Sequence, residues 1–561
     1  MSLGLNKTQH AKSAHFSGSA LFAFFIATLL AIPVITIALF ALSPSTEIWQ
    51  HLKDTVLSEY LINSLVLAIS VGVASVLIGT STAWLTTLYQ FPGQRLLPWL
   101  LLLPLAMPAY IIAFTYSGLL DSVGSVQSQL RSITGWQYGD YWFPEIHSLG
   151  GAISMLTLVL YPYVFLLARA SFLEQSICAL DVGRTLGLSP WQRFRRIALP
   201  MARPSIVAGA SLVIMETLAD YGTVQYFGIS TFTTGIFRTW FGLGDAAAAA
   251  NLSAILLLFV FAFLGIEKYS RRQRGYQSTS QRHQRIQPQV LTGYKAWLTS
   301  ALCFAPFVFG FAIPALQLSS WAIDASAQID RDFLMLCWNS FWLAAVTATL
   351  AVSLAAILIF QQRRAQLLRK PSAKLSAFSL RIAGMGYAIP GTVIAVGVMI
   401  PAGLLDNGLN NIFEHLTGQR YGLLLSGSFA LLIFAYLVRF MAVSLQSVEA
   451  GFSKIKISLD DAARSLGLNS WQTLQKIHLP MLKSTLLTAL LIVFVDVLKE
   501  LPATLVMRPF NFNTLAVRAF ELASDERLSD AALPAIAIIL TGLIPVLLLS
   551  RSIAHRVEKN A

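Results

Sequence analysis

The amino-acid sequence predicts an all-α, polytopic membrane protein with twelve transmembrane helices in two tandem six-helix halves. Three observations support this prediction: an apolar composition, regularly spaced apolar runs and a long internal repeat. Of the 561 residues, 55% are hydrophobic and only 12% are charged, and the mean hydropathy is +0.64. Soluble domains carry about 25% charged residues, so this composition excludes a soluble globular protein.

Twelve charge-poor apolar runs are each about 20 residues long, the length that crosses a hydrocarbon core as a helix. The first, over residues 21–42, is longer than the apolar part of a typical secretion signal and lacks a following Ala-x-Ala pattern, so we expect a retained helix. The runs begin near Leu21, Leu61, Leu97, Leu149, Ser205, Asn251, Trp297, Phe333, Ile382, Tyr421, Ser484 and Ala531.

Lysine and arginine gather in alternate loops, which sets the expected orientation because positively charged flanks resist translocation. With a cytoplasmic N-terminus, the C-terminus is cytoplasmic too, and the intervening loops are acidic or mixed. The net charge of +13 is then mostly cytoplasmic loop charge, available to anionic lipid headgroups, and it requires no nucleic-acid partner. The basic stretches are 169–203, 271–295, 363–381, 454–483 and 551–559.

An internal repeat divides the chain at an offset of 280 residues. Residues 181–201 read DVGRTLGLSPWQRFRRIALPM and residues 461–481 read DAARSLGLNSWQTLQKIHLPM, with eleven of the 21 positions identical. Chance similarity between hydrophobic segments would not keep Asp, Arg, Gly, Trp and Pro in register. Each copy lies in a basic loop, which we name the first motif (about 171–203) and the second motif (about 451–483).

Weaker echoes extend the repeat over the rest of each half. Asn63-Ser64 corresponds to Asn339-Ser340, Pro108 to Pro390, and the set Phe232, Thr234 and Arg238 to Phe512, Thr514 and Arg518. We therefore expect a first half over 1–269, a basic cytoplasmic linker over 270–295, and a second half over 296–561. An even number of spans separates the motifs, so the halves are expected to be related by an axis along the membrane normal.

Local rules predict two short helices in each motif. In the first, an amphipathic helix leads through Leu186 and Gly187 ends it in the left-handed conformation. Ser189 then caps a new helix with Pro190 at its first position, and we expect this helix to run until Pro200 stops it. Gly467, Asn469 and Ser470 repeat the pattern. Exposed apolar residues among arginines indicate a docking element for a partner protein, or alternatively a helix that lies on lipid.

The second motif resembles the EAA loop of binding-protein-dependent ABC importer permeases, an acidic residue and two alanines followed by Gly and Ile-x-Leu-Pro. Asp461, Ala462, Ala463, Gly467, Ile477, Leu479 and Pro480 fit it, with Asp in place of Glu. The first motif departs at the alanine pair, where it has Val182 and Gly183. The docking residues that the resemblance implies are Asp181, Arg184, Gly187, Trp191 and Pro200, and Asp461, Ala462, Ala463, Arg464, Gly467, Trp471 and Pro480.

In that family the loop sits in a cleft of an ATP-binding subunit. Two loops imply two copies of an ABC ATPase subunit, which would carry ATP and Mg, together with a periplasmic substrate-binding protein and a bacterial inner-membrane location. This chain has no G-x-x-x-x-G-K-[ST] phosphate loop, so we expect a transport subunit that binds no cofactor and has no catalytic residues.

The stretch DYGTVQYFGISTFTTGIFRTW, residues 220–240, is similar to ferric-iron permeases, which are also fused two-half chains. Fused thiamine permeases share the architecture and remain the alternative. A secondary transporter also has two parallel six-span halves, but it would not carry an EAA-type loop between the fourth and fifth span of each half. A structural or receptor role is disfavoured by acidic side chains inside the spans.

Those acidic side chains lie in the span after each motif. Glu216 and Asp220 in the first half match Asp496 and Glu500 in the second, and each pair is spaced i,i+4, which places both carboxylates on one helix face. Intramembrane carboxylates usually face a cavity or a partner, and carboxylate oxygens suit a hard cation. The four are thus a candidate lining for an iron pathway without a fixed metal site, or are structural, with Lys499 neutralising one of them.

Three tyrosines could also line the pathway. Tyr110, Tyr116 and Tyr221 would add phenolic oxygens to a pathway, with Tyr221 adjoining Asp220. Tyrosine at the end of a membrane helix is more often an interfacial anchor, and this alternative stays open.

Overall fold

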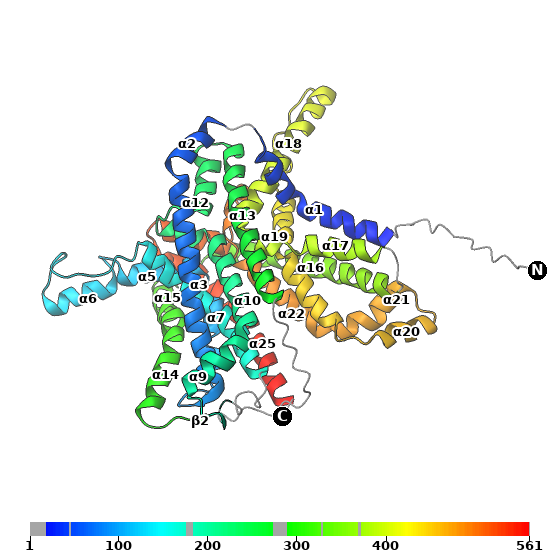
Figure 1. The fold of residues 1–561 in the computed structure, drawn as a ribbon. Coiled ribbons are helices and arrows are strands. Elements are labelled where there is room, and N and C mark those ends of the chain that lie inside the picture. The colour runs from blue at the N-terminus through cyan, green and yellow to red at the C-terminus, as the bar shows by residue number, and fades with distance from the viewer. Residues whose placement is uncertain are drawn as a thin grey trace, which may run out of the picture.

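The computed structural model describes residues 18–43, 46–174, 183, 185–272, 289–326, 329–367 and 372–559 (Figure 1). The all-α prediction is confirmed, because the described chain is helical apart from two strands of two residues each. Within the described residues, eleven helices are long and apolar enough to cross a membrane, and a bent pair of helices, taken as one span, brings the number to twelve. The strands β1 (Tyr89–Gln90) and β2 (Gln289–Val290) pair in parallel and tie the start of the second half to the first.

The first half contains the helices up to residue 272. They are α1 (Gly18–Phe40), α2 (Glu47–Thr55), α3 (Leu57–Leu88), α4 (Leu97–Leu100), the 3₁₀ turn η1 (Leu103–Ala106), α5 (Ala109–Leu120), α6 (Ser125–Thr134), α7 (Leu149–Glu174), α9 (Pro190–Arg193), the π turn η2 (Phe194–Ala198), α10 (Leu199–Ala219), α11 (Gly222–Tyr226), α12 (Phe232–Phe237), the π turn η3 (Arg238–Gly242) and α13 (Ala246–Arg272).

The second half follows with corresponding elements. They are α14 (Tyr294–Phe307), the π turn η4 (Val308–Ala312), α15 (Ile313–Asp324), α16 (Arg331–Leu367), α17 (Ala373–Ala383), the 3₁₀ turn η6 (Gly386–Ala388), α18 (Gly391–Thr417), α19 (Phe429–Phe452), α20 (Ile457–Ser465), α21 (Ser470–Thr473), the π turn η7 (Leu474–His478), α22 (Leu479–Leu498), α23 (Pro502–Met507), α24 (Leu515–Ser524) and α25 (Leu528–Lys559).

Three expected spans differ in detail from the prediction. The third is broken: the helical segment before Ala106 and the one after Ala109 meet at 92°. The ninth begins at Gly391 rather than near Ile382, which lies in the separate helix α17, and the tenth begins at Phe429 rather than near Tyr421. The breaks have a common cause, because Pro108 and Pro390 are the N-caps of α5 and α18 and have no N–H to continue a preceding helix. Hydropathy alone does not register such a break.

The two halves interlock. The helices α3, α7 and α10 pack together in the first half, and α16, α19 and α22 do so in the second. The first span of each half contacts the other half: α1 packs on α17 and α18, while α14 packs on α3 and α15 on α5, besides α25 of its own half. Gly397 of α18 marks one crossing, since a Cβ there would lie 2.5 Å from the carbonyl oxygen of Pro33 in α1. Each hydrophobic core therefore contains helices of both halves.

Candidate functional site

The bend predicted in each motif is present and nearly identical in the two copies. Gly187 and Gly467 have φ of +72° and +74°, the left-handed conformation that favours glycine. One residue further on, Leu188 N–H donates to the carbonyl of Gly183 and Leu468 N–H to that of Ala463, both at 3.0 Å. The first helix of the second motif is α20; that of the first motif, with Asp181 and Arg184, lies mostly outside the described residues.

The second helix of each motif starts with the predicted cap. Ser189 precedes α9 and Asn469 precedes α21, and each side chain accepts the backbone N–H of a glutamine, Gln192 or Gln472. The side-chain oxygen of the glutamine in turn accepts the N–H of the cap residue itself, at 2.9 Å in the first motif and 3.0 Å in the second. These capping boxes satisfy helix-end donors that would otherwise lack partners, so both motifs present preformed helix ends.

The prediction that Pro200 ends the second helix of the first motif is wrong, and Pro480 does not end the corresponding helix either. In each motif the helix continues through a π turn, η2 or η7, into the membrane-spanning helix α10 or α22. A π turn closes hydrogen bonds one residue further back than an α-helix does, and it directly precedes each proline-containing first turn. A proline there lacks only an N–H that the widened turn does not require. The motif and the span thus form one continuous rod.

Apolar side chains of both motifs are exposed. Leu186 and Trp191 expose 71% and 67% of their surface, and Leu466 and Trp471 expose 80% and 57%. Asp461 and Arg464 form an exposed ion pair on the same surface. Of the expected docking residues, Ala463 differs: it is 1% exposed and packs inward. The remaining described ones, Gly187, Pro200, Ala462, Gly467 and Pro480, are exposed.

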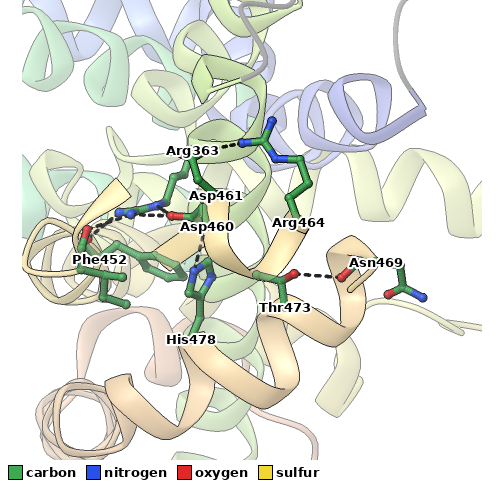
Figure 2. Close-up of polar contacts among 9 residues, drawn as sticks. Arg363, Phe452, Asp460, Asp461, Arg464, Asn469, Thr473 and His478 are labelled. Atoms are coloured by element: carbon green, nitrogen blue, oxygen red, sulfur yellow. Dashed lines mark hydrogen bonds and ion pairs between the residues drawn. The ribbon is translucent and has the colours of Figure 1, made fainter. Parts of the chain in front are cut away.

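The second motif is fastened to its helical core by a polar joint that sequence reasoning missed (Figure 2). Arg363 of α16 donates from Nη2 and Nε to one carboxylate oxygen of Asp460, at 2.8 and 3.1 Å. The other oxygen of Asp460 lies 3.0 Å from Nε2 of His478. The only sequence signal was a difference between copies, since the offset of 280 pairs Asp460 with Leu180 and His478 with Ala198.

The first motif is held by aromatic rings instead. Trp84 of α3 lies 5.4 Å from Phe172 and 5.0 Å from Phe194, measured between ring centroids. Phe172 and Phe452 correspond at the offset of 280, so the positions are shared while the interactions differ. One motif is anchored by stacking and the other mainly by charge.

The four intramembrane carboxylates converge. Glu216, Asp220, Asp496 and Glu500 all line one cavity of about 140 Å³, together with Tyr110 and Tyr221; we call it the deep cavity. Repeat symmetry explains the convergence, because the two spans that follow the motifs meet across the interface of the halves. Tyr110 is 5% exposed and its hydroxyl has no hydrogen-bond partner among the described residues.

The expectation that each pair shares one helix face is wrong. Helix α10 ends at Ala219, and Asp220 accepts the N–H groups of Thr223 and Val224 at the start of α11. Glu500 does the same for Ala503 and Thr504 at the start of α23. Both carboxylates are thus helix caps in a break of the backbone, which the i,i+4 spacing does not reveal.

Two cations share the deep cavity with the carboxylates. Lys499 Nζ lies 2.8 Å from Asp496, as the structural alternative anticipated, and Arg439 Nη1 lies 3.5 Å from Glu500. Among the described residues, no group of three or more His, Cys, Asp or Glu side chains is placed to hold a metal ion.

A second, wide cavity of about 1250 Å³ adjoins the deep one. Its lining includes Asp121, Asp525 and Glu526, and His147, which directly precedes α7. Because α7 leads from His147 to the first motif, the wide cavity lies at the opposite end of this helix from the motif. In Figure 1, α9 and α20 lie toward the bottom and lower right, and α6 points to the left, away from them.

Aromatic rings separate the two cavities. Tyr110 lines the deep cavity, Phe237 and Phe520 line the wide one, and Tyr221 lines both. Ring centroids are 6.3 Å apart for Tyr110 and Phe520, and 4.8 Å apart for Tyr221 and Phe237. Tyr110, Tyr116 and Tyr221 are all at least 94% buried, so the alternative that they anchor at the lipid interface is wrong. Tyr116 instead donates to the Phe309 carbonyl.

The weaker echoes have a structural role as well. Asn63 and Ser64 hold the chain before α12, where Ser64 Oγ accepts the N–H of Phe232. Ser340 Oγ accepts the N–H of Leu515 at the start of α24. The caps of these helices are Thr231 and Thr514, three residues away from the predicted alignment at an offset of 280. The predicted pairing of Phe232 with Phe512 is therefore displaced by an insertion.

Known proteins resemble this chain over most of its length. The Fe(3+)-transport system permease protein FbpB 2 of Haemophilus influenzae is 25% identical over 88% of this chain and 90% of its own. A putative ferric transport system permease, FbpB 1 of the same organism, is 22% identical over 82% and 71%. The thiamine transport system permease ThiP, also from Haemophilus influenzae, is 22% identical over 90% and 91%.

The family match covers both halves separately. Residues 75–275 and 364–559 each match the family described as binding-protein-dependent transport system inner membrane component. Each match contains one of the two motifs and the span that follows it. The chain therefore belongs to this family, the permease subunits of ABC importers, with two permease halves fused in one polypeptide.

Proposed function

We propose that this ABC importer permease conducts ferric iron, delivered by a periplasmic binding protein, across the bacterial inner membrane. The carrying observation is the convergence of Glu216, Asp220, Asp496 and Glu500 on the deep cavity, because carboxylate oxygens attract hard cations. The names of two relatives that match most of the chain point to the same substrate. The proposed path runs from the wide cavity past Tyr221 into the deep cavity.

The two motifs are the proposed docking sites for two ABC ATPase subunits, which bring ATP and Mg. Trp191 and Trp471 are 67% and 57% exposed, which leaves large apolar surface in both motifs for a partner protein to cover. The bends at Gly187 and Gly467 have nearly the same φ, as docking of two identical partners would favour. Under this proposal the motifs and both termini face the cytoplasm, and the wide cavity faces the binding protein.

Substrate identity is tested by uptake of radiolabelled ferric iron and of radiolabelled thiamine, each with its matching binding protein and with the ATPase subunit. We expect iron uptake that disappears when the ATPase subunit is deleted. Thiamine uptake without iron uptake would establish the second candidate, which the relative named as a thiamine permease favours. Iron uptake that persists without the ATPase subunit would refute the docking role of the motifs.

A further inference from the structure

The joint at Asp460 brings several helices of the second half together at one point. Besides its two bonds to Asp460, Arg363 donates from Nη1 to the Phe452 carbonyl at the end of α19 and from Nη2 to the Ile455 carbonyl, both at 2.8 Å. His478 belongs to η7, which leads into α22. The joint thus links α16, α19, α20 and α22 (Figure 2).

The joint is buried, which makes it stiff. The side chains of Arg363 and Asp460 are 15% and 10% exposed, and that of His478 is fully buried between the rings of Phe360 and Phe452, 5.3 and 5.5 Å away. Charge-assisted hydrogen bonds are shorter and about twice as strong as neutral ones. The planar guanidinium also fixes the angle between α16 and the second motif, because its four bonds point in set directions.

The first half has no counterpart of this joint among the described residues. The offset of 276 that relates Asn63 to Asn339 along α3 and α16 places Thr87 opposite Arg363. The Thr87 hydroxyl donates to the Ala83 carbonyl within its own helix, and Ala198 stands where the second half has His478. Among the described residues, this polar joint is thus a feature of the second motif.

Helix α16 continues from the joint to the wide cavity. It is an unbroken helix of 37 residues, and near its other end Ser340 accepts the N–H of Leu515, the first residue of α24, at 2.7 Å. Helix α24 carries Phe520, Glu521 and Asp525 toward the wide cavity. At a helical rise of about 1.5 Å per residue, one rod of about 35 Å therefore connects Arg363 with the start of α24, the helix that lines the wide cavity.

We propose that Arg363 is a positioning residue that transmits movement of the second motif through α16 to α24, and that this joint couples ATP hydrolysis to opening of the path. This inference rests on the proposed docking role of the motifs. Without Arg363, the motif moves with its ATPase subunit while α16 no longer follows. Hydrolysis then continues with less transport.

The test is the ratio of solute imported to ATP hydrolysed, measured in proteoliposomes that contain the full permease, the ATPase subunits and the binding protein. Arg363→Met should lower this ratio about fivefold or more, the lower range of allosteric coupling, while the ATPase subunits still copurify. Arg364→Met is the matched control, because Arg364 is the next residue of the same helix, carries the same charge and is exposed. It should leave the ratio unchanged.

A variant with smaller disturbance guards against loss of folding. Asp460→Asn keeps the size of the side chain and leaves the bonds of Arg363 to the two carbonyls, and we expect a reduced ratio here too. An unchanged ratio in both variants, an equal drop in Arg364→Met, or loss of the ATPase subunits from Arg363→Met would overturn the proposal. Failure of the substrate proposal is separate, because the same ratio is then measured with thiamine.

Discussion

At the scale of single residues, the four carboxylates of the deep cavity divide by what holds them. Asp220 and Glu500 cap helices, and Asp496 pairs with Lys499. Glu216 has a hydrogen bond with Tyr387, and in the described part of the chain it caps no helix and forms no ion pair within 4 Å. Glu216 is therefore the carboxylate whose charge is most available to a passing solute.

Replacing Glu216 with Gln keeps the size and a hydrogen-bond acceptor but removes the charge. We expect normal amounts of assembled complex and iron uptake lowered about tenfold, which corresponds to about 1.4 kcal/mol of lost attraction. Replacing Asp496 with Gln in addition should slow uptake further. Radiolabelled iron uptake, normalised to permease detected in the membrane, measures both effects; an unchanged rate would leave these carboxylates structural.

Replacing Glu500, in contrast, should lower the stability of the folded protein. Glu500→Ala removes the acceptor of the Ala503 and Thr504 N–H groups and leaves Arg439 without its carboxylate. Breaking a buried charge pair from one side costs about 3–5 kcal/mol, so the purified protein should unfold at a lower temperature. A variant with wild-type thermal stability and slow uptake would instead assign Glu500 to the path.

The sequence was sufficient to locate the four carboxylates after the two motifs but not to assign their roles. The repeat and the cost of a charge in the membrane were sufficient to select Glu216, Asp220, Asp496 and Glu500. The end of α10 at Ala219 coincides with the bonds of Asp220 to Thr223, three residues further on. Such a local side-chain bond to the backbone competes with a continued helix, and the i,i+4 spacing of the carboxylates does not reveal it. The joint of Arg363, Asp460 and His478 escaped because its members lie far apart in the chain.

At the scale of helices, proline was a correct signal in some places and a wrong one in others. Pro108 and Pro390 mark real breaks, whereas Pro200 and Pro480 lie in continuous helices behind π turns. The same arrangement occurs before Pro314, which follows the π turn η4. A rule based on the missing N–H alone cannot distinguish these cases, because the preceding turn decides whether that N–H is needed.

Close packing between α1 and α18 gives a prediction at this scale. A side chain at Gly397 meets the backbone of Pro33, with the nearest atom 2.5 Å from its Cβ, whereas Gly403 of the same helix has nothing within 4 Å. Gly397→Val should destabilise the protein by about 1–3 kcal/mol or more, as overpacking does. Gly403→Val is the matched control, and equal thermal unfolding temperatures would contradict the packing described.

At the scale of the whole molecule, the interlocked halves predict how the chain tolerates cutting. Because α1 packs on α18 and α15 packs on α5, neither half has a complete core alone. Residues 1–280 and 281–561, expressed separately, should fail to accumulate, and together they should copurify and restore uptake. Accumulation of either half alone in folded form would contradict the exchange of helices. Hydropathy gave the order of the spans but carried no information on this exchange.

The thin aromatic partition at Tyr110 and Tyr221 has an electrical consequence. The wide cavity brings the potential of one side of the membrane close to these rings, so most of the membrane voltage falls across the partition and the deep cavity below it. A charge that crosses the full voltage gains about 2.3 kcal/mol per 100 mV, hence about 7 kcal/mol for a trivalent ion. For inward movement at a negative-inside potential, the rings thus work as an insulator that keeps this driving force concentrated over a few side chains until the path opens.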